Sequence, residues 1–169
     1  VVFARRSTSN PHGALLHDLY YYDFATEKEH RLSKGLRAES VDVSPDGKYL
    51  LFTINEAGKR DMAIALLPDL SKKIKPFTDT DLLLRFPALP HEQYYLPRWS
   101  PDGNKIAVAH HLREGRGIRI YSFDANTSTL TFDREFDGKR AELRDPSWSA
   151  DGKSLYVSND ESGIANIYK

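Results

Sequence analysis

The sequence has no cysteine among its 169 residues. This excludes a disulfide framework, a zinc–thiolate site and a thiol nucleophile, but assigns no compartment. There is also no excess of charge, because 24 basic residues balance 24 acidic ones. Nucleic-acid binders usually carry a basic excess or stripe, so we expect no nucleic-acid partner. No apolar run approaches the roughly 18 residues of a membrane helix, so we expect no membrane insertion by this segment.

Recognisable catalytic motifs are absent as well. The chain contains no Gly-x-Ser-x-Gly nucleophile elbow and no glycine-rich phosphate loop. Its Asp-Gly pairs lack the alternating oxygen ligands and the terminal glutamate of an EF-hand. We therefore predict no catalytic residue, no cofactor and no catalytic activity in this segment.

What the sequence does contain is a repeated turn. Three segments align without gaps: Val43–Lys48, Trp99–Asn104 and Trp148–Lys153. Their shared positions are Val43, Trp99 and Trp148, then Asp46, Asp102 and Asp151, then Gly47, Gly103 and Gly152. Asp accepts hydrogen bonds from nearby amides and Gly adopts a positive φ, so each copy predicts a tight turn between two strands.

Alternating apolar residues follow each turn, as in Leu50 and Phe52 or Ile106 and Val108. A period of two indicates strands with one face on a core. A third strand follows, as at Ile120–Asp124, and we expect a fourth, more polar strand at Lys28–Leu32, Lys73–Phe77 and Leu130–Phe136. Four short strands in each repeat are typical of β-propeller blades.

The predicted fold is therefore all-β: a partial β-propeller of four-stranded antiparallel blades, with two whole blades flanked by two incomplete ones. The blades are expected at residues 1–37, 38–94, 95–144 and 145–169, with three, four, four and three strands. Fewer than four complete blades cannot easily close a ring. We therefore interpret the chain as an excerpt of a longer one; the alternative is that two copies complete a ring together.

The turn, the alternating strand and the Ile-Tyr strand together resemble the TolB-type propeller repeat, a relative of the WD repeat. The resemblance covers nearly the whole chain. Val43 replaces the tryptophan in one copy and Ala150 the proline in another. TolB is a periplasmic partner in the Tol–Pal envelope system, so the resemblance implies a bacterial envelope setting.

Three functional interpretations follow, and fold alone does not choose among them. The first is a non-catalytic scaffold that binds a protein, either an envelope lipoprotein or another domain of the same chain. The second is an accessory propeller that controls access to a larger enzyme, as in prolyl-oligopeptidase-like peptidases. The third is a metal- or cofactor-binding propeller.

Histidines supply the only candidates for that third interpretation. Propeller loops that join the second strand to the third, and one blade to the next, emerge on one face. The histidines expected there are His12, His17, His91, His110 and His111. Imidazole is a common metal ligand, but no spacing motif is present, so we predict no shared metal site.

The connection expected between the second and third blades, Thr78–Tyr94, is unusually long. Structureless loops of that length are uncommon and tend to be functional. We expect a short helical turn around Asp81–Arg85 and a partner site where apolar residues are rimmed by arginine. The candidate residues are Leu82, Leu83, Leu84, Arg85, Phe86, His91, Arg113 and Arg116. The alternative is that Leu82–Phe86 merely caps the propeller.

Overall fold

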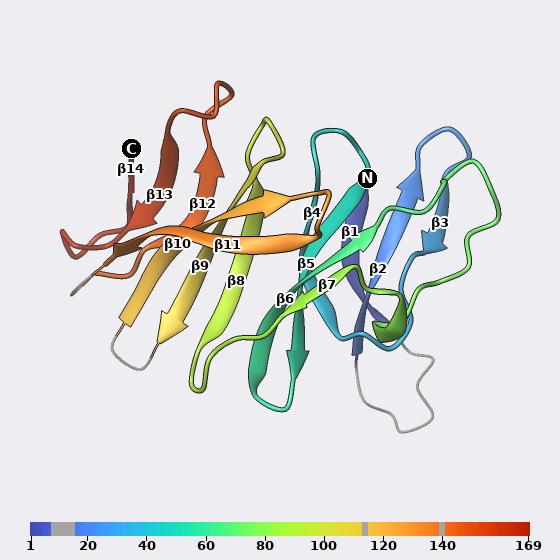
Figure 1. Cartoon of the computed structure of the whole chain (residues 1–169), viewed down its shortest axis with the longest axis horizontal. Coiled ribbons are helices and arrows are strands. Elements are labelled where there is room, and N and C mark those ends of the chain that lie inside the picture. The colour runs from blue at the N-terminus through green and yellow to red at the C-terminus, as the bar shows by residue number, and fades with distance from the viewer. Residues whose placement is uncertain (8–15, 113–114, 139–140) are drawn as a thin grey trace.

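The computed structural model of the chain describes residues 1–7, 16–112, 115–138 and 141–169. The described residues form fourteen strands and a single turn of 3₁₀ helix. The strands are arranged as a fan of small sheets standing side by side (Figure 1). The fan is an open arc, which confirms the all-β, partial propeller.

The outer two blades have three strands each among the described residues. The first comprises β1 (Val2–Ser7), β2 (Leu16–Asp23) and β3 (Lys28–Arg31). The last comprises β12 (Arg144–Trp148), β13 (Leu155–Asn159) and β14 (Asn166–Tyr168). In both, each strand pairs antiparallel with the next one along the chain.

The two central blades have four strands each. The second blade contains β4 (Ala38–Val43), β5 (Tyr49–Glu56), β6 (Lys59–Leu66) and β7 (Leu84–Phe86). The third contains β8 (Gln93–Trp99), β9 (Lys105–Leu112), β10 (Gly115–Asp124) and β11 (Thr129–Asp137). A single parallel bridge, Arg60 to Gln93, joins these two blades into one continuous sheet.

The repeated turn has the same hydrogen bonds in each copy. The Ser44 hydroxyl donates to the Asp46 carboxylate at 2.7 Å, and the Tyr49 amide donates back to that hydroxyl at 2.9 Å. Gly47 adopts φ 70°, a conformation that side chains with a Cβ rarely take. Ser100 with Asp102, and Ser149 with Asp151, repeat the arrangement.

Hydrophobic cores lie between the blades. Phe52 and Leu19 belong to the core between the first and second blades. Met62 packs with Trp99 between the second and third, and Ala109 with Leu143 between the third and fourth. Each blade is therefore stabilised mainly by its neighbours, as in other repeat folds.

The fourth strand of the second blade is not where the sequence placed it. The prediction of a strand at Lys73–Phe77 is wrong, because β7 pairs with β6 at that position. Apolar burial decides the outcome: Leu84 and Phe86 pack into the core, whereas Lys73 and Lys75 are exposed.

The long connection is consequently residues 67–83, between β6 and β7, and only residues 87–92 join β7 to β8. Residues 67–83 extend over the first blade (Figure 1), where Phe77 exchanges backbone hydrogen bonds with Leu32 and Lys34 at 2.9 Å. The predicted helical turn at Asp81–Arg85 is also wrong. The 3₁₀ turn, η1, is Asp79–Asp81: the Asp81 carboxylate accepts the Thr78 amide at 2.9 Å and fixes the start of the turn, and Leu84–Phe86 pair with β6 as a strand.

The blades place their hairpins on two opposite faces, as expected. The Ser-x-Asp-Gly turns lie at one end of the sheets, at the top in Figure 1. We call the other end the hairpin face. It carries the β5–β6 turn at Glu56–Lys59, the start of β8 at Gln93, the end of β9 at His110–Leu112 and the start of β10 at Gly115–Arg116.

Candidate functional site

The innermost strand of each complete or final blade carries the same backbone irregularity. In β4, β8 and β12 the pairing register shifts, and the extra residues form a β-bulge. Ser40, Leu96 and Asp145 occupy equivalent positions and have φ of 52°, 46° and 53°. Non-glycine residues rarely adopt such angles, so the bulges are locally strained backbone held by the surrounding sheet.

Side chains next to these bulges interact across the blades. Glu39, beside the bulge in β4, pairs with His17 at 3.1 Å and with Arg60 at 2.9 Å. The Arg60 guanidinium in turn lies over the Tyr95 ring, 4.4 Å from its centroid. The Tyr95 hydroxyl donates to the Gln93 side chain. These contacts hold side chains of the first three blades in fixed positions on the hairpin face.

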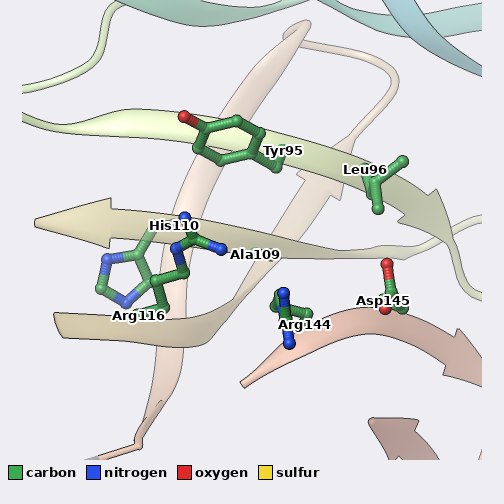
Figure 2. A pocket seen from close by; sticks show the side chains of 7 residues that line it. All are labelled: Tyr95, Leu96, Ala109, His110, Arg116, Arg144 and Asp145. Atoms are coloured by element: carbon green, nitrogen blue, oxygen red, sulfur yellow. The ribbon is translucent and has the colours of Figure 1, made fainter. Parts of the chain in front are cut away.

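A cavity of about 90 Å³ lies between the third and fourth blades. Figure 2 shows the side chains that line it: Tyr95, Leu96, Ala109, His110, Arg116, Arg144 and Asp145. They come from β8, β9, β10 and β12, so the cavity is a property of two adjoining blades. Leu96 and Asp145, which carry the strained bulges of β8 and β12, are both part of this lining.

Two arginines of the cavity share one carboxylate. Glu142 Oε2 lies 3.2 Å from Nη1 of Arg116 and 3.6 Å from Nη1 of Arg144. One negative charge therefore faces two positive ones. Asp145 contributes a second carboxylate at an exposed position of the lining.

His110 forms the inner wall of the cavity and is 3% exposed. Its Nε2 lies 3.1 Å from Glu135 Oε1, and its Nδ1 lies 3.6 Å from Glu92 Oε1. Arg119 pairs with both glutamates. Gly117 leaves room for the imidazole, because a Cβ there would lie 2.8 Å from His110 Nε2.

Burial and the Arg119 charge lower the pKa of His110 below its ordinary value, and the two glutamates oppose this shift. The imidazole is therefore neutral at pH 7. A neutral imidazole has one donor and one acceptor nitrogen, so His110 supplies the cavity with polarity but no charge.

The structure places the predicted partner residues in two groups. Leu82, Leu83, Leu84 and Phe86 are half-buried against the cores, and Arg85 pairs with Asp61, Asp79 and Glu56. They belong to β7 and its approach, so they do not stand on the hairpin face as a loop. His91 is exposed at that face and Arg116 lines the cavity. Arg113 lies outside the described residues, and a role in partner binding stays a prediction for the whole set.

Among the histidines proposed as metal ligands, His12 also lies outside the described residues. His17 faces Glu39, His91 is exposed, and His111 is half-buried beside His110 on β9. In the part of the chain that the structure describes, no group of three or more His, Cys, Asp or Glu side chains is placed to hold a metal ion.

Sequence reasoning missed most of the cavity. Tyr95 and Arg144 stand four residues before the repeated tryptophan position, and Glu39 stands four before Val43. Extending the repeat alignment backwards from the turn would have revealed this position. It is polar or aromatic in every copy, which is unexpected for an inner strand that only packs.

No protein-family model matches the sequence, and no curated protein matches it. Solved structures do. TolB from Acinetobacter baumannii is similar with a TM-score of 0.63 and 21% identity, over 98% of this chain and 37% of that one. Putative TolB from Agrobacterium tumefaciens has a TM-score of 0.60 and 23% identity, over 99% of this chain and 57% of that one. A puromycin-hydrolyzing peptidase from Mycobacterium tuberculosis has a TM-score of 0.58 and 17% identity, over 99% of this chain and 28% of that one.

These likenesses, with the sheet arrangement, define the class of protein: a β-propeller. The likeness to the two TolB structures confirms the resemblance that the turns predicted. The chain spans less than two thirds of the length of each of the three structures. Helices of membrane-crossing length and apolarity do not occur among the described residues.

Proposed function

We propose that this chain is a non-catalytic binding propeller of the bacterial envelope that holds a protein partner on its hairpin face. The observation that carries the proposal is a row of large side chains there from three successive blades. It comprises Arg60 on β6, Tyr95 on β8, Arg116 on β10 and Arg144 on β12.

The chemistry of this row suits a protein partner. Tyrosine and arginine are enriched at the centres of interfaces, where they supply large contact areas together with directed hydrogen bonds. Here they are already fixed: Arg60 by Glu39 and the Tyr95 ring, and Arg116 by Glu142. Side chains fixed in advance lose little further entropy on binding. The row therefore has the properties of a preformed contact surface.

The likeness to TolB structures supports the envelope setting. The same likeness suggests that the partner is an envelope lipoprotein or another domain of the same chain. Fractionation of the producing cells tests the setting. We expect the protein in the periplasmic fraction, and recovery with the cytoplasmic enzymes would contradict it.

Site-directed photocrosslinking tests the binding face. A photoreactive residue is placed at His91, which is exposed on the hairpin face, and, as the matched control, at Asn126, which is exposed in the turn between β10 and β11. We expect a discrete crosslinked product in living cells from position 91 and none from position 126. Equal products from both, or a product from 126 alone, would contradict the proposal.

The likeness to the puromycin-hydrolyzing peptidase favours a second candidate, the accessory propeller of a larger enzyme. In that case the hairpin face would contact a catalytic domain of the same polypeptide. The same experiment separates the two, because crosslinks from position 91 would then be intramolecular and would not change the mass of the chain.

A further inference from the structure

The first two blades each bury an acid–base pair of the same kind. In the first blade Asp18 pairs with Arg31 at 2.5 Å, and in the second Asp61 pairs with Arg85 at 3.0 Å. Asp18 is 1% exposed and Asp61 is 6% exposed. Each arginine stands on the outermost strand, opposite the residue two places after the aspartate, so the pair is part of the repeat.

The third blade has a different pair at this place. The aspartate position is Gly117, and the arginine position is Glu135, which lies opposite Arg119. The His110 imidazole fills the space that Gly117 leaves, and its Nε2 lies 3.1 Å from Glu135 Oε1. A histidine and a glutamate thus replace the arginine and the aspartate. Histidine ordinarily changes charge between about pH 5 and 8, so this pair can respond to mild acid.

The surroundings of the imidazole oppose its protonation. The titratable and charged side chains that face it are Glu92 before β8, Tyr94 on β8, Arg116 and Arg119 on β10, and Glu135 and Asp137 on β11. On the fourth blade, Arg144 and Asp145 line the same inner cavity as His110 (Figure 2). Burial and the Arg119 charge lower the pKa of His110, and the carboxylates of Glu135, Glu92 and Asp137 only partly offset this.

A second cavity, which we call the outer cavity, lies beside the same imidazole at the hairpin-face end of the third blade. Its volume is about 380 Å³, and its lining includes His110, Gly117, Glu135 and Asp137. Asp137 is exposed, so this cavity is in contact with water. An imidazolium in the outer cavity would regain hydration and would face two carboxylates, which is the environment that favours the charged form.

We propose that His110 is a pH switch: the imidazole is neutral and buried near pH 7, and in mild acid it takes up a proton and turns outward into the outer cavity. The change adds a positive charge to the hairpin face beside Arg116 and withdraws the imidazole from its place between Glu92 and Glu135. The switch requires no partner, so it can succeed or fail independently of the proposed function.

The switch also sets the sign of a stability change. A histidine whose pKa is lower in the folded state than its ordinary 6.5 binds a proton less readily there than in the unfolded chain. Folding therefore loses stability as the pH falls below about 6.5, down to the pKa of the folded state. This window lies above the range in which aspartates titrate.

The protonation step is tested by nuclear magnetic resonance on the wild-type protein. The ring signal of His110 is followed from about pH 8 to about pH 4.5, in the folded protein and in the urea-unfolded protein. We expect the midpoint at lower pH in the folded protein, and at still lower pH in Asp137→Asn, which removes a carboxylate that favours the imidazolium. A midpoint equal to or above that of the unfolded chain overturns the switch, and an unchanged midpoint in Asp137→Asn overturns the role of the outer cavity.

The movement is tested by crystal structures of the wild-type protein on either side of the transition, at about pH 7.5 and about pH 5. We expect the imidazole between Glu92 and Glu135 in the first and in the outer cavity in the second. The same position of the ring in both structures overturns the proposed movement.

Two variants assign the stability change to His110. Urea unfolding of His110→Gln and of the control His91→Asn is compared with the wild type at about pH 7.5 and about pH 5.5. His91 is exposed, and asparagine tolerates its φ of 65°. We expect the wild type and His91→Asn to lose the same stability on acidification and His110→Gln to lose less. An equal loss in all three proteins overturns the assignment.

Discussion

Trp99 and Trp148 occupy the same position of the repeat but differ in burial. Trp99 is 6% exposed and contacts the rings of Tyr49 and Phe123, whose centroids lie 6.3 and 5.1 Å away. Trp148 is half-buried and donates its Nε1 hydrogen to the Arg98 carbonyl at 3.2 Å. The side chain at this position therefore packs between blades in both copies. We expect it to contribute more to stability at Trp99, which is more fully buried than Trp148.

We expect Trp99→Ala to lower the free energy of unfolding by about 3–5 kcal/mol, because it removes buried area and leaves a cavity. Trp148→Ala should cost distinctly less, since part of the ring already contacts solvent. Urea denaturation followed by circular dichroism measures both. Equal costs for the two variants would show that the burial difference does not govern stability at this position.

At the scale of strands, β7 depends on one arginine. Arg85 pairs with Asp61 at 3.0 Å, with Asp79 at 3.0 Å and with Glu56 at 2.8 Å. Asp61 is buried, and its carboxylate also accepts the Ala88 amide at 3.0 Å. Arg85 thus joins the outermost strand of the blade to β5 and β6.

Arg85→Ala should lower the free energy of unfolding by about 1–3 kcal/mol, because Asp61 is left buried without its cation. The control is Arg134→Ala on β11, where an exposed side chain should change stability by less than about 0.5 kcal/mol. Thermal unfolding of the two variants compares them. A neutral Arg85→Ala would mean that the packing of Leu84 and Phe86 alone holds β7.

The repeated turns predict a pH dependence. Hydrogen bonds from Ser44, Ser100 and Ser149 lower the pKa values of Asp46, Asp102 and Asp151 below 3.8. A carboxylate whose pKa is lower in the folded state stabilises the fold above its unfolded pKa, and this contribution is lost as the pH falls through the folded value. Stability should therefore decrease below about pH 4.

Ser100→Ala tests the cause, because it removes the largest contribution to the Asp102 shift. The variant will be less stable at neutral pH, since the hydroxyl also accepts the Lys105 amide at 2.9 Å. The informative quantity is the slope of the melting temperature between pH 4 and pH 2, which should be shallower in the variant. An unchanged slope would exclude the hydrogen bond from Ser100 to Asp102 as a contributor to it.

The same elements show how far the sequence could lead. The Ser-x-Asp-Gly turns and their alternating strands were predictable because every hydrogen bond in them is local. β7 was not, since three residues carry no readable period and its position depends on a core made with the third blade. The bulges at Ser40, Leu96 and Asp145 also escaped prediction. None of these residues is glycine, so their positive φ values are imposed by the sheet and have no local signal.

The whole molecule is an arc with apolar surface exposed at its C-terminal end. Ile167 is 81% exposed and Ile164 is 73% exposed on the last blade, and Phe136 is 44% exposed beside it. In a propeller the flank of each blade is covered by its neighbour. We expect a protein consisting of residues 1–169 to self-associate, because uncovered apolar flanks and strand edges favour pairing with another chain. Light scattering that shows a stable, soluble monomer would contradict this.

The proposed function requires that the hairpin face binds a protein through its arginine and tyrosine side chains. Its most direct test is the affinity of the crosslinked partner, once identified, for the wild-type protein and for Arg116→Ala, measured by calorimetry beside the opposite-face variant Asn126→Ala. We expect at least tenfold weaker binding for Arg116→Ala, with its fold intact by circular dichroism, and unchanged binding for Asn126→Ala. Unchanged affinity for Arg116→Ala, or loss only in Asn126→Ala, would contradict it.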